Sequence, residues 1–407
     1  MDYEALLNLA IELGHSLAIN GAETFRVEEC INRIMNAYEI KSETFAIPNC
    51  LHVSIETHDG TSLTRMKRIG FHGNDLDAIE KYNSICRKIC KEHPEPKAAA
   101  QWLKETKQSC RHHSLPIYLL GSFMGGCGFS ILFNGSIFDC LIGGICGLAI
   151  GVVNKTMNRW KVNPFFSTII ASFIMTTIAC LSNLFWRGFN TDAIMIGALM
   201  ILVPGLPFTN AMRDIIYGDT NSGVNRIVQV FLIAAAIVLG TGSAWTFANN
   251  LWGVPTVQSI INHSILFESV ASLLGCFGFA ILFNIHGKGK LYTAFGGALT
   301  WVVFRLTSML TNDVSLSYFI GTITAALYSE IMARIRLCPA LSYLVISAFP
   351  LLPGAGVYNT MRYAVSGNMT EFINTGIKTI GIAGIMAVGI LLVSTVVRII
   401  TVNRTQK

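Results

Sequence analysis

Apolar and polar positions change their period along the chain, and the change separates a front part from the rest. Helical spacing occurs in three sets of residues before residue 113. The sets are Leu6, Ala10, Leu13 and Leu17; Val27, Ile31, Ile34 and Tyr38; and Leu76, Ile79, Asn83, Cys86 and Cys90. Residues 53–58 alternate between apolar and polar side chains, as a strand does, and Asp59-Gly60 is a hairpin signal. We expect an α+β domain of two helices, a small antiparallel sheet and two more helices, with residues 93–108 as a polar link.

Beyond residue 113 the pattern consists of long apolar stretches. Most are near the ~20 residues that a helix needs to cross about 30 Å of hydrocarbon. The stretches are 115–133, 137–153, 164–185, 192–217, 225–246, 262–284, 291–310, 314–333, 340–366 and 375–398. Basic residues gather in alternate loops, which predicts that both termini are cytosolic.

Two of these stretches are interrupted by a Pro-Gly pair. The uninterrupted runs 193–203 and 341–352 have 11 and 12 residues. At ~1.5 Å per residue each covers about 17 Å, roughly half of the bilayer. This favours helices that are broken near the membrane midplane. The alternative is a short span followed by an interfacial helix.

The interrupted stretches belong to an internal repeat. When Pro204 is aligned with Pro353, six of 16 positions are identical at an offset of 149. Residues 128–134 and 278–284 are identical at six of seven positions, at an offset of 150. The fold class that we expect is a polytopic α-helical membrane protein with ten spans, arranged as two inverted five-span repeats behind a cytosolic α+β domain. The predicted domains are 1–113, 114–250 and 251–407.

Composition and charge agree with this division. The chain is 52% hydrophobic and 13% charged, whereas soluble chains carry roughly 25% charge. Residues 1–113 hold 14 basic and 16 acidic side chains, and the remainder holds 16 basic and 8 acidic ones. The basic excess therefore lies between apolar stretches, which points to membrane orientation and not to nucleic-acid binding. The start, MDYEALLNLAIE, has no basic region before an apolar core, so no signal peptide is expected.

Cysteines and histidines do not predict a metal or a cofactor. None of the 11 cysteines forms a CxxC pair, and all are expected to be reduced thiols in or near the cytosol. Cys86 and Cys90, four residues apart on a helix, fit core packing better than a zinc site. His52, His58 and His72 lack ligand spacing and are expected to be solvated.

The strongest candidate site lies at the two breaks. Each break starts a new half-helix whose first N–H groups lack intrahelical partners and carry the positive end of the helix dipole. A pseudo-two-fold axis would bring the two starts together and create a seat for a carboxylate. The alternative is that the breaks only kink the helices for packing. The candidate substrate-binding residues are Pro204, Gly205, Thr209, Asn210, Pro353, Gly354, Tyr358 and Asn359.

Charged residues follow each break. Arg213 and Arg362 come nine residues after the proline, about 13 Å further along a helix. They could gate the substrate, or they could reach headgroups or cap loop carbonyls. Asp214 is a further charged candidate, but Tyr363 stands at its equivalent position in the second copy.

Ionisable residues inside the other spans are the candidates for proton coupling. Glu268 and Arg305 lie at matching depths in the sixth and seventh stretches, so we expect an ion pair between neighbouring helices. Glu330 lies near the inner end of the eighth stretch, within reach of Arg334. The sequence leaves open whether Glu268 and Arg305 form a structural pair or a proton relay.

An enzymatic front domain is a hypothesis of another class, in which the spans only anchor a hydrolase-like domain. Glu23, Arg26 and Arg33 lie near one face of the helix that starts in GAETFRVE. They could form a catalytic or regulatory cluster, or be charge pairs at a helix start. No spacing in residues 1–113 forms a recognisable catalytic set, and no Walker or GxSxG motif is present.

GAETFRVE, VPGLPFTNAMRDIIYGD and LLPGAGVYNTMRY together give the chain a family resemblance. Over nearly its whole length the chain resembles the bacterial threonine/serine exporter family, in the form that fuses both halves. The resemblance implies a proton-driven exporter of small amino acids in the cytoplasmic membrane. Protons, membrane lipid and a small-molecule substrate would be its partners, without a cofactor or nucleic acid, and it could form a homo-oligomer. Related two-gene systems imply a dicarboxylate exporter as the alternative, and a passive channel is a third hypothesis.

Overall fold

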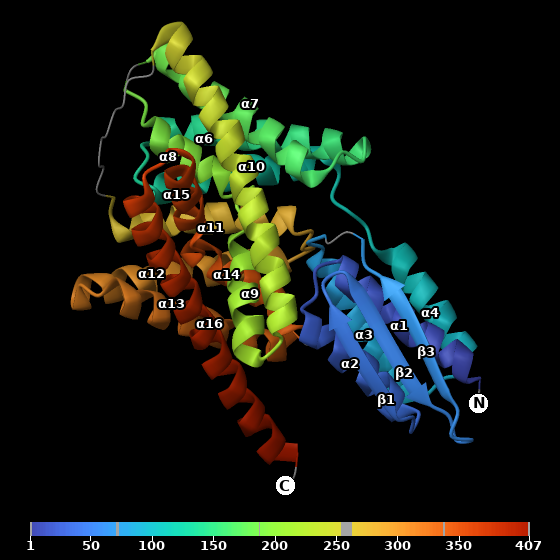
Figure 1. The fold of residues 1–407 in the computed structure, drawn as a ribbon. Coiled ribbons are helices and arrows are strands. Elements are labelled where there is room, and N and C mark those ends of the chain that lie inside the picture. Colours follow the sequence, from blue (N-terminus) through green and yellow to red (C-terminus); the bar gives the residue numbers. More distant parts are fainter. Residues whose placement is uncertain (1, 71–72, 187, 254–262, 337, 406–407) are drawn as a thin grey trace. The chain divides into compact units, whose positions relative to one another are not determined.

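The chain folds into two compact units. The computed structural model describes residues 2–70, 73–186, 188–253, 263–336 and 338–405 (Figure 1). The first unit contains residues 1–113, here called the front domain, together with Phe283–His286 and Leu337–Ser342. The second unit contains Ser114–Leu282, Gly287–Arg336 and Tyr343–Lys407.

The front domain combines helices with one sheet. Its elements are α1 (Tyr3–Ile19), α2 (Thr24–Ala37), β1 (Ser42–Ile47), β2 (Cys50–Glu56), β3 (Ser62–Arg68), α3 (Leu76–Glu92) and α4 (Pro96–Ser109). The strands are antiparallel in the order β1-β2-β3, and Gly60 forms the turn of the predicted hairpin with a φ of +78°. Leu51, Val53 and Ile55 alternate along β2 and are buried, because α1 packs on that face of the sheet. This is the alternation that the sequence pattern predicts.

The polar link expected over residues 93–108 is wrong, because α4 occupies most of it. Pro96 stands at the first position of α4, where its missing N–H costs no hydrogen bond. The following residues favour a helix, and Ala99 and Leu103 are buried on the inner face. His93 ends α3 in a left-handed conformation, so the two helices are separated by a short turn.

The second unit is a bundle of apolar helices. They are α5 (Leu115–Leu132), α6 (Ile137–Arg159), α7 (Pro164–Phe185), α8 (Thr191–Leu199), α9 (Gly205–Tyr217), α10 (Thr220–Trp252), α11 (Ile265–Leu282), α12 (Gly289–Thr311), α13 (Val314–Arg336), α14 (Ala340–Ala348), η1 (Phe349–Leu351), α15 (Gly354–Val365) and α16 (Met369–Thr405). Within the described residues, eight helices are long and apolar enough to cross a membrane, and a ninth span results if one bent pair is counted. The chain is therefore a multi-pass membrane protein, and the tenth span stays a prediction.

Glycines bring α5 and α11 into close contact in a reciprocal way. A Cβ added at Gly128 would lie 2.5 Å from the nitrogen of Gly275, and one at Gly278 would lie 2.5 Å from the nitrogen of Gly125. These two contacts are related by the repeat offset of 150. Side chains at these positions would force the helices apart, which explains why small residues occupy them.

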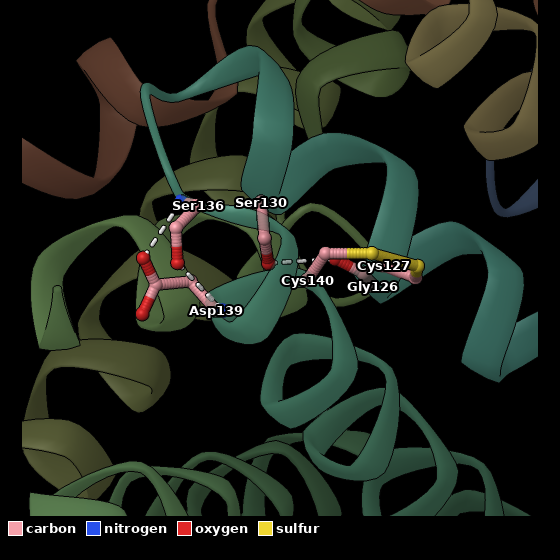
Figure 2. Close-up of a disulfide and its surroundings, with 6 residues drawn as sticks. All are labelled: Gly126, Cys127, Ser130, Ser136, Asp139 and Cys140. Atoms are coloured by element: carbon pink, nitrogen blue, oxygen red, sulfur yellow. Dashed lines mark hydrogen bonds between the residues drawn. A yellow bond between two sulfur atoms is a disulfide. The ribbon is translucent and has the colours of Figure 1, made fainter. Parts of the chain in front are cut away.

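The expectation that all cysteines are reduced is wrong for one pair. Cys127 of α5 and Cys140 of α6 form a disulfide, while the other nine cysteines are free (Figure 2). The two Cα atoms are 4.3 Å apart. The helices can approach this closely because a Cβ at Gly126 would overlap the carbonyl of Gly143. A separation of 13 residues without a motif gave no signal of this pairing.

Candidate functional site

Both Pro-Gly segments interrupt a helix, as predicted. The first break separates α8, which ends at Leu199, from α9, which begins at Gly205. The second break separates η1 from α15, which begins at Gly354, and the helices on its two sides are bent by 53°. In each copy the proline precedes the new helix directly, which leaves the first N–H groups of that helix without intrahelical partners.

The two breaks contact each other. A Cβ added at Gly205 would lie 3.0 Å from the Cβ of Leu352, and one at Gly354 would lie 2.9 Å from Cγ1 of Val203. Val203 and Leu352 are themselves equivalent at the offset of 149. The contacts are thus reciprocal, and each break packs its glycine against the residue that precedes the other break's Pro-Gly pair.

The helices that surround the breaks share a small apolar core. Phe208, Val230 and Ala234 pack together with Val357 and Ala383. Phe208 is equivalent to Val357, and Ala234 is equivalent to Ala383, again at the offset of 149. Across the halves, α9 packs against α16 and α15 packs against α10. Equivalent residues of the two copies therefore meet in one cluster.

The polar residues after the breaks differ in how they are used. The buried Thr209 hydroxyl donates to the Gly205 carbonyl at 3.2 Å. Tyr358 is buried in the cluster that joins α7, α8 and α10. Asn210 and Asn359 are both half-buried, and within the described part of the chain neither carboxamide takes part in a hydrogen bond. These two amides are therefore available to a bound molecule.

A small cavity lies beside the second break. Its volume is about 130 Å³, and Pro353 and Gly356 line it together with the rings of Phe129, Trp301 and Tyr318. Such a volume corresponds to about four water molecules. It is therefore suited to a small solute and not to a large ligand.

The ion pair expected between Glu268 and Arg305 is present. Arg305 Nε donates to Glu268 Oε2 at 2.7 Å, and Trp301 Nε1 donates to the same oxygen at 3.0 Å. Glu268 is 6% exposed. Sequence reasoning missed Trp301, although it stands one helical turn before Arg305 and so shares its helix face. Glu330 lies half-buried on α13.

The charged residues beyond the breaks are placed differently in the two copies. Arg213 and Asp214 are buried, at 7% and 6% exposure, and Arg226 Nε lies 3.1 Å from Asp214 Oδ2. Burial of Arg213 inside the protein does not fit a side chain that reaches for lipid headgroups. Arg362 is exposed and lies over the ring of Tyr363, 5.4 Å from its centroid.

The front domain shows no metal site in the residues that the structure describes. No group of three or more His, Cys, Asp or Glu side chains there could hold an ion, and His72 lies outside the described residues. Cys86 is buried and donates to the Cys30 carbonyl at 3.6 Å. Hydrogen bonding to Cys30 together with burial raises the pKa of Cys86 far above its ordinary value. Such a thiol is a poor metal ligand, in line with the expected core role.

Arg26 and Arg33 belong to a surface group of charges on α2. Both pair with Glu29, at 3.2 and 2.7 Å. These are i,i+3 and i,i+4 pairs on one helix, which is the arrangement expected of helix-stabilising charges.

The long apolar helices and the broken helices in contact define a class, that of multi-pass membrane transporters. The chain belongs to the threonine/serine exporter family ThrE, whose two models match residues 8–248 and 268–396. The family inferred from the sequence motifs is thereby confirmed.

Individual relatives carry two kinds of description. A protein of Mycobacterium tuberculosis named "Probable threonine/serine exporter" is 18% identical, over 96% of this chain and 76% of that protein. Proteins of Klebsiella aerogenes and Escherichia coli, both named "Probable succinate transporter subunit YjjP", are each 25% identical to this chain. Those two matches cover 62% and 61% of this chain and 96% of each relative. No solved structure matches the chain.

Proposed function

We propose that the protein is a secondary transporter that exports threonine and serine across the bacterial cytoplasmic membrane, driven by proton entry. Its substrate site is formed by the two breaks. The observation that carries this proposal is the reciprocal contact of Gly205 with Leu352 and of Gly354 with Val203. Two interrupted helices that meet at their interruptions are the usual way in which transporters build a site inside a membrane.

The reciprocal contacts support a two-fold relation between the halves. Under two-fold symmetry, a contact from residue i to residue j is matched by one from the equivalent of i to the equivalent of j. The pairs at the breaks and the pairs between α5 and α11 both follow this rule. If each broken pair counts as one span, each half has five, and an odd number turns the second copy over in the membrane. An inverted repeat with ten spans and cytosolic termini is the resulting proposal.

The chemistry of the breaks suits a zwitterionic amino acid. The first N–H groups of α9 and α15 carry positive partial charge and favour the carboxylate. The free carboxamides of Asn210 and Asn359 can accept from an ammonium group or donate to a hydroxyl or carboxylate. Pro204 and Pro353 keep the helix starts open. The cavity of about 130 Å³ at the second break provides room for a small side chain.

Glu268 is the preferred candidate for proton coupling. Trp301 connects it to the cavity, because the indole ring lines that space while its Nε1 donates to Glu268 Oε2 at 3.0 Å. Protonation of Glu268 would weaken its pairing with Arg305 and thereby loosen one wall of the cavity. Glu330 is the alternative proton carrier.

Transport in inside-out vesicles tests the function directly. The vesicle lumen corresponds to the cell exterior, so an acidic lumen should drive labelled threonine inward. Counterflow of threonine should persist without a gradient, as it does for a carrier and not for a channel. The proposal is wrong if threonine uptake does not exceed that of vesicles without the protein.

The same assay separates the two proton candidates. We expect Glu268→Gln to keep counterflow and to lose the response to an acidic lumen, because the amide cannot release a proton. Glu330→Gln is the matched control and should keep both activities. A Glu268→Gln variant that still responds to the gradient excludes Glu268 as the carrier.

A dicarboxylate is the second candidate substrate. It is favoured by the two relatives named as succinate transporter subunits. Two helix starts could each bind one carboxylate. Uptake of labelled succinate in the same vesicles distinguishes the two substrates. The true substrate should be taken up above background, and a low concentration of the same unlabelled compound should inhibit that uptake.

A further inference from the structure

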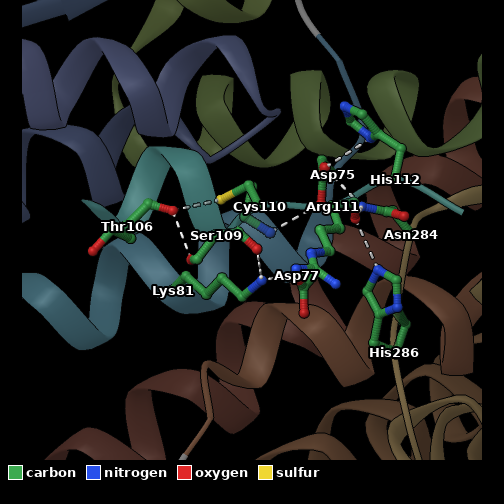
Figure 3. A network of polar contacts seen from close by, with 12 residues as sticks. Asp75, Asp77, Lys81, Thr106, Ser109, Cys110, Arg111, His112, Asn284 and His286 are labelled. Carbon is green, nitrogen blue, oxygen red and sulfur yellow. Dashed lines mark hydrogen bonds and ion pairs between the residues drawn. The ribbon is translucent and has the colours of Figure 1, made fainter. Parts of the chain in front are cut away.

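The front domain holds a short segment of the second half by a partly buried polar network. Asn284, in the loop between α11 and α12, donates to Asp75 Oδ2 at 2.8 Å and to the Arg111 carbonyl at 3.0 Å (Figure 3). Its carbonyl oxygen accepts from the backbone N–H of His113 at 3.1 Å. His286 adds a hydrogen bond to the Arg111 carbonyl at 3.0 Å. With 6% of its surface exposed, Asn284 has its carboxamide fully occupied by the front domain.

The same contact pairs the ends of two helices. The N–H of Leu76, the first residue of α3, donates to the carbonyl of Phe283 at 3.0 Å. Phe283 directly follows the last residue of α11. Neither group has an intrahelical partner, so each satisfies the other. Asp75 also caps α3 by accepting from the Ala78 N–H at 2.9 Å.

A second contact reaches the segment that leads into the second break. Cys338, between α13 and α14, donates its thiol to Glu80 Oε1 at 2.8 Å. Residues up to Ser342, which include the first turn of α14, belong to the same compact unit as the front domain. Since α14 and η1 run directly into Pro353, the front domain holds the start of the helix that the second break interrupts.

The repeat supplies an internal comparison for Asn284. Asn134 is its equivalent at the offset of 150, at the end of α5. Both residues adopt a left-handed conformation, with φ of +61° for Asn284 and +66° for Asn134. Asn134 is exposed, whereas Asn284 is buried against the front domain. Both asparagines therefore provide a left-handed backbone conformation after their helix. Of the two, the buried Asn284 is the one whose carboxamide binds the front domain.

We propose that the front domain is a clamp that positions the second break for transport. The clamp surface consists of Asp75, Glu80 and the Arg111 carbonyl, and its intramolecular partner is formed by residues 283–286 and Cys338. Asn284 is the positioning residue of this contact. This inference rests on the proposed transport site. It gives the front domain a role in only one of the two repeats.

Cross-linking tests the contact without reference to transport. A Glu80→Cys substitution places a thiol opposite the native Cys338, and mild oxidation should join them. The product is detected as a linked peptide pair by mass spectrometry, with Glu80→Ser as the control. Asn284→Gly removes the carboxamide and keeps the left-handed backbone. It should lower the cross-linking yield about tenfold, as expected for loss of hydrogen bonds to a charged group. Asn134→Gly should not change the yield.

Transport then tests the positioning role. Asn284→Gly should lower the maximal rate of threonine counterflow about tenfold, with KM and the amount of protein in the membrane unchanged. Asn134→Gly should leave the rate unchanged. Prolonged oxidation of the Glu80→Cys, Asn284→Gly double variant, continued until the disulfide is complete, should restore the rate, because the disulfide replaces the lost hydrogen bonds. Oxidation of the Asn284→Gly single variant should not.

Two outcomes would overturn the proposal, and they differ from a failure of the transport assignment. Equal cross-linking yields in the Asn284→Gly and Asn134→Gly backgrounds would show that Asn284 does not hold the clamp. A reduced yield with normal counterflow would show that the clamp does not position the break. If the unmodified protein carries neither threonine nor succinate, the proposed function fails, and the cross-linking yields still decide whether the clamp exists.

Discussion

The two breaks have the same centre and different surroundings. Gly205 and Gly354 pack reciprocally, and a half-buried asparagine follows each of them by five residues. Beyond that point the copies diverge. In the first copy the buried Asp214 pairs with the half-buried Arg226, whereas in the second copy Arg362 is exposed on the ring of Tyr363. The two copies therefore share the residues at the contact between the halves and differ in the charged residues at the periphery.

The lead-in helices differ in the same way. The start of α8 is held by the second unit itself, because the Asn190 N–H donates to Asp139 at 2.9 Å and Asn183 donates to Thr191 at 2.5 Å. The start of α14 instead belongs to the unit of the front domain. One broken helix is thus anchored by its own bundle, and the start of the other belongs to the unit of the front domain. A two-fold site can respond asymmetrically when only one of its halves is attached in this way.

The largest effect should come from the asparagines at the centre. Asn210→Leu and Asn359→Leu should each abolish threonine transport, because leucine removes the hydrogen-bonding groups and fills their space. Protein in the membrane should stay at its normal level, since neither carboxamide is bonded to the described part of the chain. Counterflow in vesicles and quantitative blotting of the membranes measure both quantities.

The comparison of the two asparagine variants is itself informative. Equal losses would indicate that both copies contact the substrate. Near-normal transport by either variant would remove that asparagine from the site and leave the other copy as the binding half.

A somewhat smaller effect is expected at the glycines, where packing is altered and the polar groups remain. Gly205→Val and Gly354→Val should lower the free energy of unfolding by similar amounts, about 1–3 kcal/mol each. The reason is that each new side chain would overlap the other break. Gly242→Val is the matched control, since a Cβ there meets nothing within 4 Å. Thermal unfolding in detergent measures the difference. Unequal losses at the two breaks would argue against reciprocal packing.

Much of this arrangement could be predicted from the sequence. Local patterns located the helices, the hairpin at Gly60 and both breaks, because each depends on residues that are close in the chain. The offset of 149 identified the equivalent pairs, and matching depths predicted the ion pair of Glu268 with Arg305. All of these depend on period, spacing or turn chemistry, which one sequence contains.

Contacts between distant segments could not be predicted in this way. The disulfide of Cys127 with Cys140 depends on how closely glycines let two helices approach. Asn284 meets Asp75 across 209 positions, and the sequence shows it only as one of two repeated asparagines. The burial of Arg213 likewise depends on the packing of α9 in the bundle, and its equivalent Arg362 is exposed.

Exchanging Asp214 and its equivalent Tyr363 tests whether the two peripheries differ in their contribution to stability. Asp214→Tyr makes the first copy resemble the second at this position and leaves Arg226 without its partner carboxylate. Loss of one member of a fully buried pair costs about 3 kcal/mol, and the cost should be smaller here because 19% of the Arg226 side chain is exposed. We expect a corresponding fall in thermal stability in detergent, and Asp214→Asn should recover part of it by retaining a hydrogen-bond acceptor.

The opposite exchange, Tyr363→Asp, should have the smallest effect. It removes a contact between an exposed guanidinium and a ring, which is worth about 0.5–1 kcal/mol. The new carboxylate could still pair with Arg362, but the position equivalent to Arg226 is Thr375, so no second cation is supplied. Thermal stability and transport should therefore stay close to those of the unmodified protein. A loss of thermal stability as large as that of Asp214→Tyr would mean that the two peripheries contribute equally to stability. The asymmetry between the two copies would then be confined to the clamp.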